Sequence, residues 1–299
     1  MRRREGDSLQ SLFCATPLCI MSAMIIFGTD EAGYGPNLGP LVVSLTVWKA
    51  DTDDLSPLFA PLEKAGISIG DSKKLYHGGS LDTLETGVLV PLRFLKRSVV
   101  PVASDEERLA LLVPRFEEIL RQYQVRLLDM QYRSIEPEEF NRLVDRFGSK
   151  GSLLSDATLR LIADRLATFT QDNVLVLCDK HGGRNRYLDI LTECFAGEFI
   201  QVVQEIRECS VYRLISEGRQ WEFRFLAKGE AHLPIALASM LSKYHRELAM
   251  LRFNAFWQFH VPDLQPTAGY PEDAKRFKRQ IAATQEKLGI ADESLWRKR

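Results

Sequence analysis

The sequence predicts an α/β fold, in which helices flank a mixed β-sheet and a helical appendage follows at the C-terminus. Two observations support this fold. Apolar runs of strand length dominate the first half, whereas long segments with helical spacing dominate after residue 136. The chain has 299 residues and no internal repeat, which fits one large domain with a small addition.

The expected strands are short apolar runs bounded by turn residues. Residues 24–30 form the first, and a short Gly- and Pro-rich link joins them to 39–50 as a hairpin. The further expected strands are 88–104, 124–135, 173–179, 198–206 and a hairpin over 210–227. Apolar residues at helical spacing predict helices over 104–123, 136–148, 153–171, 233–259 and 271–289.

Composition excludes several classes of protein. With 39 Lys and Arg against 40 Asp and Glu, the net charge of −1 excludes a uniformly basic nucleic-acid coat, although a local basic groove stays possible. No apolar run reaches the roughly 18–20 residues that span a bilayer, so no membrane association is expected. Five cysteines without a Cys-x-x-Cys pair favour neither a disulfide framework nor a structural zinc site, and they indicate a cytoplasmic protein.

The chain divides into three predicted parts. Residues 1–23 are expected to be a disordered tail, 24–260 the main domain, and 261–299 a helical appendage packed on it. The basic start and short apolar patch also suggest a secretory leader, but Glu5 and Asp7 interrupt the basic region and the first strand follows at once. A start codon assigned too early is the other alternative, with Met21 or Met24 as the true start.

Three carboxylates stand at the ends of predicted strands. Asp30 and Glu31 close the first strand, and three glycines and two prolines follow within residues 33–40. Asp179 closes another strand, and such strand ends line the ligand crevice of open α/β sheets. Clustered carboxylates repel one another unless a divalent cation neutralises them, and their hard oxygens favour Mg²⁺ or Mn²⁺. The alternative for each acid taken alone is an ordinary turn or a solvated side chain.

Several segments together resemble the type 2 ribonucleases H, that is, ribonuclease HII and its HIII relatives. "GTDEAGYGPNLGPLVV" is similar to the opening Asp-Glu-Ala/Val-Gly-Arg-Gly-Pro motif of this family. The other similar segments, in the family's order, are "GDSKKL" (70–75), "VLVLCDK" (174–180), "KGEAHLPIALASMLSKYHREL" (228–248) and "AGYPEDAKRF" (268–277). The resemblance runs from about residue 24 to 280 and implies a ribonuclease-H-like sheet.

The resemblance also implies four catalytic acids that bind Mg²⁺ or Mn²⁺. Asp30, Glu31 and Asp179 match the first three, and Glu230 falls where the family has Asp. Glu247, at another family Asp, is expected to support the site and is the alternative fourth ligand. The implied reaction is two-metal cleavage of the RNA strand of an RNA–DNA hybrid, or of a ribonucleotide within duplex DNA, which leaves a 5′-phosphate.

Substrate-binding residues are implied in the same way. The Gly33-Tyr34-Gly35 turn replaces the family's Gly-Arg-Gly, which senses the ribose 2′-hydroxyl, and Tyr270 matches a tyrosine that packs on the ribose. The candidates for phosphate contacts and their support are Ser72, Lys73, Lys74 and Lys243. Further candidates are His181 and Arg184, which can equally belong to a simple turn. The basic residues Lys275, Arg276, Lys278 and Arg279 are also candidates, and their alternative is an ordinary exposed helix face.

Two other functions stay open at this point. Tyr34 and Glu230 depart from the family pattern, so a catalytically impaired protein that binds nucleic acid without cleaving it is the first alternative. A related nuclease or phosphotransfer enzyme that acts on another nucleic acid is the second. In each case nucleic acid is the expected partner, and the resemblance implies a monomer.

Overall fold

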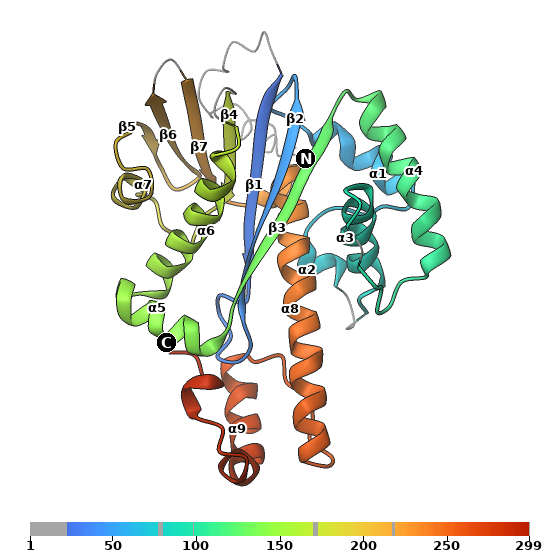
Figure 1. Ribbon diagram of the computed structural model, residues 1–299, viewed down its shortest axis with the longest axis vertical. Helices are drawn as coiled ribbons and strands as arrows, with labels where there is room; N and C mark the ends of the chain where they lie inside the picture. Colours follow the sequence, from blue (N-terminus) through green and yellow to red (C-terminus); the bar gives the residue numbers. More distant parts are fainter. Residues whose placement is uncertain (1–22, 77–79, 98, 170–172, 217–218, 299) are drawn as a thin grey trace, which may run out of the picture.

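The computed structural model describes residues 23–76, 80–97, 99–169, 173–216 and 219–298. Within them the strands form a seven-stranded sheet in the order β3-β2-β1-β4-β7-β6-β5 (Figure 1). The strands are β1 (Met24–Ala32), β2 (Leu41–Ala50), β3 (Arg126–Ile135), β4 (Val174–Asp179), β5 (Phe199–Glu205), β6 (Cys209–Ser216) and β7 (Arg219–Leu226). The predicted tail, apart from Ala23, lies outside the described residues.

The sheet is mixed, as predicted. Strands β1, β2 and β3 form an antiparallel meander, β4 lies parallel to both β1 and β7, and β7, β6 and β5 are again antiparallel. The parallel pairing brings the carboxyl ends of β1 and β4 to one edge of the sheet. Asp30 and Glu31 in β1 and Asp179 in β4 lie at these carboxyl ends.

Helices cover both faces of the sheet and extend beyond one end of it (Figure 1). They are α1 (Phe59–Lys64), α2 (Ser72–Leu75), α3 (Asp82–Phe94), α4 (Glu106–Gln122), α5 (Pro137–Phe147), α6 (Lys150–Leu166), α7 (Leu188–Cys194), α8 (Leu233–His260) and α9 (Pro271–Lys287). Helix α7 was not anticipated from the sequence. The fold class, a mixed sheet flanked by helices with further helices at the C-terminus, is confirmed.

Alternation along the strands builds a separate core on each face. Ile26 and Trp48 face α3, α4 and α8, whereas Ile25 and Phe27 face α6 and α7. A third cluster joins the distal half of α8 to α9 and the C-terminal segment, with Trp257 and Phe277 at its centre. The C-terminal elements are therefore packed onto the rest of the chain.

The predicted strand over 88–104 is wrong, because its first part belongs to helix α3. Every residue of α3 from Leu84 to Leu92 is buried, and the run over 88–92 is wholly apolar, so it has no polar face that would reveal a 3.6-residue period. The β-branched residues Val88 and Val90 reinforced the appearance of a strand. Complete burial between α4 and α8 outweighs these local preferences.

Gly28 sets how closely α8 approaches the sheet. A Cβ atom added at Gly28 in β1 would lie 2.2 Å from the carbonyl carbon of Pro234, in the first turn of α8. We expect Gly28→Ala to push α8 off the strand and to lower the free energy of unfolding by about 3 kcal/mol or more.

Urea denaturation measures this effect, and Gly70→Ala is the matched control because a Cβ there meets open space. Equal destabilisation by the two substitutions would show that close packing at Gly28 does not position α8.

Candidate active site

A pocket of about 270 Å³ lies at the sheet edge where β1 and β4 end. It is lined by acids from the strands, by the Gly-rich turn after β1, by the loop before α2, and by one face of α8. The lining residues are Asp30, Glu31, Ala32, Gly33, Tyr34, Gly35, Pro36, Asp71, Ser72, Lys73, Asp179, Glu230, Ser239, Lys243, Arg246 and Tyr270. Of the residues implied as metal ligands or primary substrate contacts, Lys74 is not in this lining; the supporting acid Glu247 and the further candidates are also outside it.

Asp30 and Glu31 occupy the part of β1 that extends beyond its pairing with β4. That pairing ends at Thr29, while pairing with β2 continues to Ala32, so the acids lie on an edge that is open on one side. The Glu31 amide donates to Asp30 Oδ1 at 2.7 Å, and Ser242 Oγ donates to the Asp30 carbonyl at 3.0 Å. Two successive strand residues can therefore line one pocket.

Asp179, the last residue of β4, is held by the segment that carries the fourth acid. The Gly229 amide donates to Asp179 Oδ1 at 2.9 Å, and a Cβ at Gly229 would lie 3.0 Å from the same oxygen. Lys228 precedes it in the left-handed conformation, and Gly229–Ala231 form a short 3-10 helix. This tight turn places Glu230 on the pocket beside Asp179.

The pocket is electrostatically unfavourable for its own carboxylates. Burial, followed by the charge of Asp179, raises the pKa of Asp30 to about 7, although Ser239, the Glu31 amide and Lys73 partly offset this rise. Burial and the neighbouring Asp30 raise the pKa of Glu31 well above its usual value. Burial also raises the pKa of Asp179, and Glu230 adds to the rise. The positive charge that the protein supplies is therefore too small to keep the pKa values of these acids at their usual level.

The donor chemistry of the pocket fits a hard divalent cation. Four carboxylates from two strand ends and the 229–231 turn share the pocket, and carboxylate oxygens are the ligands of Mg²⁺ and Mn²⁺. Among the residues the structure describes, no group of three Asp, Glu, His or Cys side chains is arranged to hold a metal ion as it stands. A cation would thus have to draw these acids together.

The loop before α2 adds a positive charge to the rim. Asp71 caps α2 by accepting a hydrogen bond from the Lys73 amide at 2.9 Å, and Ser72 Oγ lies 3.0 Å from Ser239 Oγ on α8. These contacts hold Lys73 at the pocket. Lys74 does not line the pocket: its side chain is 82% exposed, and its ammonium lies 3.7 Å from Asp71.

Helix α8 contributes three residues at helical spacing, namely Ser239, Lys243 and Arg246. Lys243 Nζ lies 2.6 Å from Glu247 and 4.4 Å from the centre of the Tyr76 ring. Glu247 is thus engaged by Lys243 and is not in the pocket lining, whereas Glu230 is. Ser239 and Arg246 were missed from the sequence, although their spacing of four and three residues from Lys243 was a usable signal.

Tyr34 and Tyr270 close two sides of the pocket. Tyr34 is half-buried, and its hydroxyl lies so near Gly182 that a Cβ there would approach it to 2.8 Å. Tyr270 is 55% exposed and directly precedes α9. Tyr34 is therefore fixed against the turn after β4, and Tyr270 is accessible to a ligand.

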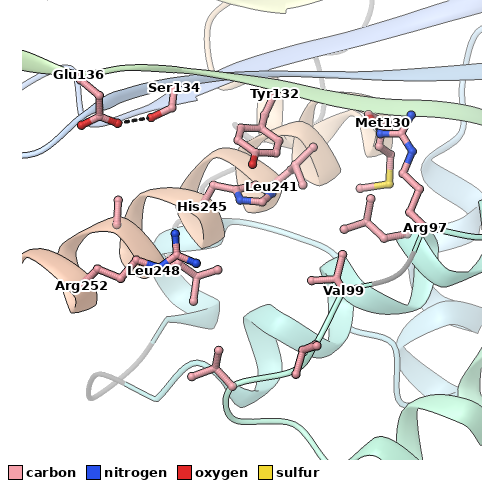
Figure 2. Close-up of a pocket in the computed structure, with 14 residues that line it drawn as sticks. Arg97, Val99, Met130, Tyr132, Ser134, Glu136, Leu241, His245, Leu248 and Arg252 are labelled. Atoms are coloured by element: carbon pink, nitrogen blue, oxygen red, sulfur yellow. Dashed lines mark hydrogen bonds between the residues drawn. The ribbon is translucent and has the colours of Figure 1, made fainter.

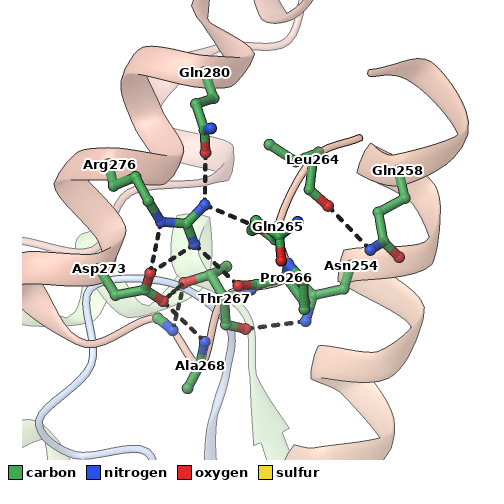
Figure 3. Close-up of polar contacts among 11 residues, drawn as sticks. Asn254, Gln258, Leu264, Gln265, Pro266, Thr267, Ala268, Asp273, Arg276 and Gln280 are labelled. Atoms are coloured by element: carbon green, nitrogen blue, oxygen red, sulfur yellow. Dashed lines mark hydrogen bonds and ion pairs between the residues drawn. The ribbon is translucent and has the colours of Figure 1, made fainter. Parts of the chain in front are cut away.

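A polar network holds the segment that leads to Tyr270 (Figure 3). Asp273 accepts hydrogen bonds from Thr267 Oγ1 at 2.5 Å and from Arg276 at 2.6 Å. Arg276 also donates to the carbonyls of Gln265 and Pro266. Arg276 is therefore occupied within the fold, and Lys275 and Lys278 form ion pairs with Glu272 and Asp292.

His181 and Arg184 do not line the pocket. His181 is buried, its Nδ1 lies 3.0 Å from Ser155 Oγ, and burial lowers its pKa to about 3. Arg184 donates to Ser152 Oγ at 3.1 Å. Both residues connect the turn after β4 to helix α6, so in this structure they belong to that turn and not to the pocket.

A larger cavity of about 680 Å³ lies on another face of α8 (Figure 2). Its wall combines Tyr132, stacked on His245 at 3.5 Å between ring centres, with apolar residues such as Leu241 and Leu248. None of the sequence-predicted site residues lines it. The part of the chain that the structure describes contains no helix long and apolar enough to cross a membrane.

Comparisons with known proteins give weak but consistent likenesses. No family model matches the chain, and no curated protein matches it. A chain from the structure of the PCNA–ribonuclease HII complex of Archaeoglobus fulgidus is similar, with 20% identity, a TM-score of 0.46, and coverage of 92% of this chain and 95% of that one.

Two further solved structures are similar over most of this chain. For ribonuclease H2 from Pyrococcus horikoshii, the identity is 16%, the TM-score 0.45, and the coverage 91% of this chain and 92% of that one. For ribonuclease H3 from Aquifex aeolicus, these values are 17%, 0.37, 91% and 70%. The chain is thus similar to solved type 2 ribonucleases H at low identity, and its function has to be judged from the pocket.

Proposed function

We propose that this protein is a divergent type 2 ribonuclease H that cleaves the RNA strand of RNA–DNA hybrids, or ribonucleotides embedded in duplex DNA. The observation that carries the proposal is the shared pocket of Asp30, Glu31, Asp179 and Glu230. Basic and small residues surround these acids on the same pocket, which is what a sugar–phosphate backbone requires. We propose that the protein acts in the cytoplasm as a monomer.

In this proposal the four acids hold Mg²⁺ or Mn²⁺. When bound, the cations supply an activated water and charge stabilisation for the leaving 3′-oxygen, which gives a 5′-phosphate product. Asp30 and Glu31 present their carboxylates from the end of β1, which pairs with β2, and the Gly229 amide holds the carboxylate of Asp179. The raised pKa values of these acids are consistent with a site that is completed by positive charge.

The remaining pocket residues orient the nucleic acid. Lys73 and Lys243 offer cationic contacts for phosphates, with Ser72 supporting the position of Lys73, and the buried Arg246 adds positive charge to the same pocket. The Gly33–Gly35 turn lets the ribose come close to backbone amides, and exposed Tyr270 offers an aromatic surface to the sugar.

Purified protein with Mg²⁺ or Mn²⁺ is expected to nick a DNA duplex that carries one ribonucleotide, or a short RNA stretch, and to leave an all-DNA duplex intact. Denaturing gels measure the cut position, and end analysis tests for the 5′-phosphate. EDTA should stop the reaction, and excess metal should restore it. Absence of nicking with either metal would overturn the proposal, and cutting of the all-DNA duplex would favour a nuclease with another substrate.

A protein that binds nucleic acid without cleaving it is the second candidate. It is favoured by Tyr34, which replaces an arginine, and by Glu230, whose side chain is one methylene longer than Asp. Tight, ribonucleotide-dependent duplex binding in the nicking buffer without a cut strand would support this candidate. Because glutamate also binds Mg²⁺, cleavage is the function that we favour.

A further inference from the structure

Arg297, two residues from the C-terminus, lies buried beneath the loop that forms the Gly33–Gly35 turn. Its side chain is 4% exposed, and it donates to the carbonyl oxygens of Gly33 at 2.5 Å, Tyr34 at 3.3 Å and Gly39 at 3.5 Å. Its backbone amide also donates to the carbonyl of Asn37 at 2.9 Å. The C-terminal segment therefore contacts this loop at four carbonyls.

The guanidinium of Arg297 is solvated by the dipoles of these carbonyls. Within the described residues no carboxylate forms an ion pair with it, and burial and the nearby Arg246 lower its pKa to about 9. Its guanidinium lies 3.8 Å from the centre of the Phe140 ring, and its Nε has no partner. A buried cation is costly unless dipoles surround it, so the loop carbonyls have to point inward.

Inward carbonyls fix the direction of the next amides. In a trans peptide the C=O of one residue and the N–H of the next point to opposite sides. The Gly33 and Tyr34 carbonyls accept hydrogen bonds from Arg297, so the amides of Tyr34 and Gly35 point away from it. The turn that carries these amides lines the acidic pocket. In the described structure neither amide donates a hydrogen bond within the protein.

We propose that Arg297 is a positioning residue, which holds the Gly33-Tyr34-Gly35 turn so that the Tyr34 and Gly35 amides receive an anionic or hydroxyl oxygen of the nucleic-acid backbone. This inference rests on the proposed function for the identity of the ligand. It also explains how a turn without an arginine side chain retains a nearby positive charge, since the guanidinium lies directly behind the turn. Successive amides that point to one side are a common anion-binding arrangement.

The position of Arg297 is itself fixed by helix α5. The Asn141 side chain donates to the carbonyls of Glu293 and Trp296 and accepts a hydrogen bond from the Lys298 amide. Lys298 Nζ lies 2.6 Å from Asp145, at the surface. Arg297 and its neighbour Lys298 thus carry the same charge in the same segment, and the Arg297 side chain contacts the turn whereas that of Lys298 pairs with α5.

The test compares Arg297→Met with Lys298→Met, each of which removes one positive charge. In NMR spectra of ¹⁵N-labelled protein, we expect Arg297→Met to shift or broaden the Tyr34 and Gly35 amide signals, and Lys298→Met to leave them unchanged. On a duplex with one ribonucleotide, Arg297→Met should raise KM about tenfold or more, with a smaller change in kcat, whereas Lys298→Met should change KM less than about twofold. Arg297→Lys should recover part of the loss, because it restores the charge without the planar fork.

Wild-type amide signals together with wild-type KM in folded Arg297→Met would overturn the inference. Thermal melting checks the fold, and Arg297→Lys takes the place of Arg297→Met if that variant does not fold. If the wild-type protein neither binds nor nicks the duplex, the proposed function fails. The NMR comparison then still decides whether Arg297 orients the turn.

Discussion

Asp30→Asn is expected to lower the rate of ribonucleotide nicking by about 10³-fold or more, while duplex binding is retained. Asp30 lies at the end of β1 in the pocket that also contains Glu31, Asp179 and Glu230. An amide cannot offer the negative charge that a divalent cation requires, but it has the same shape. Single-turnover nicking assays with saturating enzyme measure the chemical step, and fluorescence anisotropy measures binding.

The same substitution should stabilise the protein in EDTA at pH 8. The pKa of Asp30 is about 7 in the folded protein against 3.8 for an ordinary aspartate, so the folded state binds more protons than the unfolded state between about pH 4 and 7. Wild-type stability therefore falls across this window, and the loss is complete above pH 7. Asp30→Asn removes the titrating group and should raise the free energy of unfolding at pH 8 by on the order of 2–4 kcal/mol.

Asp189→Asn is the control, because Asp189 is an exposed aspartate in the first turn of α7, outside the pocket. It should leave both nicking and stability near wild-type values. Loss of activity together with loss of stability in Asp30→Asn would instead indicate a structural role for Asp30. Unchanged activity would remove Asp30 from the catalytic set.

The site acids could be predicted because they belong to short linear motifs at strand ends. Asp30 and Asp179 each follow an apolar run, and strand alternation with parallel pairing is enough to bring such ends together. Glu230 needed the family resemblance, since nothing local to "KGE" indicates a pocket. The structure then gives the physical reason for its position, which is the tight turn from Lys228 to Ala231.

Other features depend on tertiary packing that one sequence does not reveal. The second half of helix α3 was predicted as part of a strand because a segment buried on all sides carries no periodicity. Nothing in the sequence singles out Arg297, and the role that we propose for it follows from its burial against Phe140 and the turn. Lys73 and Lys74 were both predicted at the site; Lys73 lines the pocket, where Asp71 caps the start of α2, and Lys74 does not.

Glu85→Gln is expected to lower the free energy of unfolding by about 2–4 kcal/mol at pH 7, the largest loss that we expect from a substitution that preserves side-chain volume. Glu85 in α3 is fully buried. It accepts hydrogen bonds from the amides of Val102, Ala103 and Ser104 at 2.7, 2.8 and 2.5 Å, and from the Tyr244 hydroxyl at 2.8 Å. Glutamine removes the charge and turns an NH₂ group toward at least one of these donors.

The destabilisation by Glu85→Gln should depend on pH in a defined direction. Burial alone would raise the pKa of Glu85, but the three amides and Tyr244 outweigh it, so the pKa lies below the ordinary 4.5. The stabilisation is therefore complete above about pH 4.5 and is lost as the pH falls through the lower folded-state value. Urea midpoints of wild type and Glu85→Gln should move closer together as the pH falls from 7 to 3, whereas Glu117→Gln, an exposed glutamate of α4, should follow wild type throughout. Because Tyr244 lies on the helix that carries Ser239, Lys243 and Arg246, a gap that stays constant with pH would mean that packing, and not this carboxylate, anchors α8 beneath the pocket.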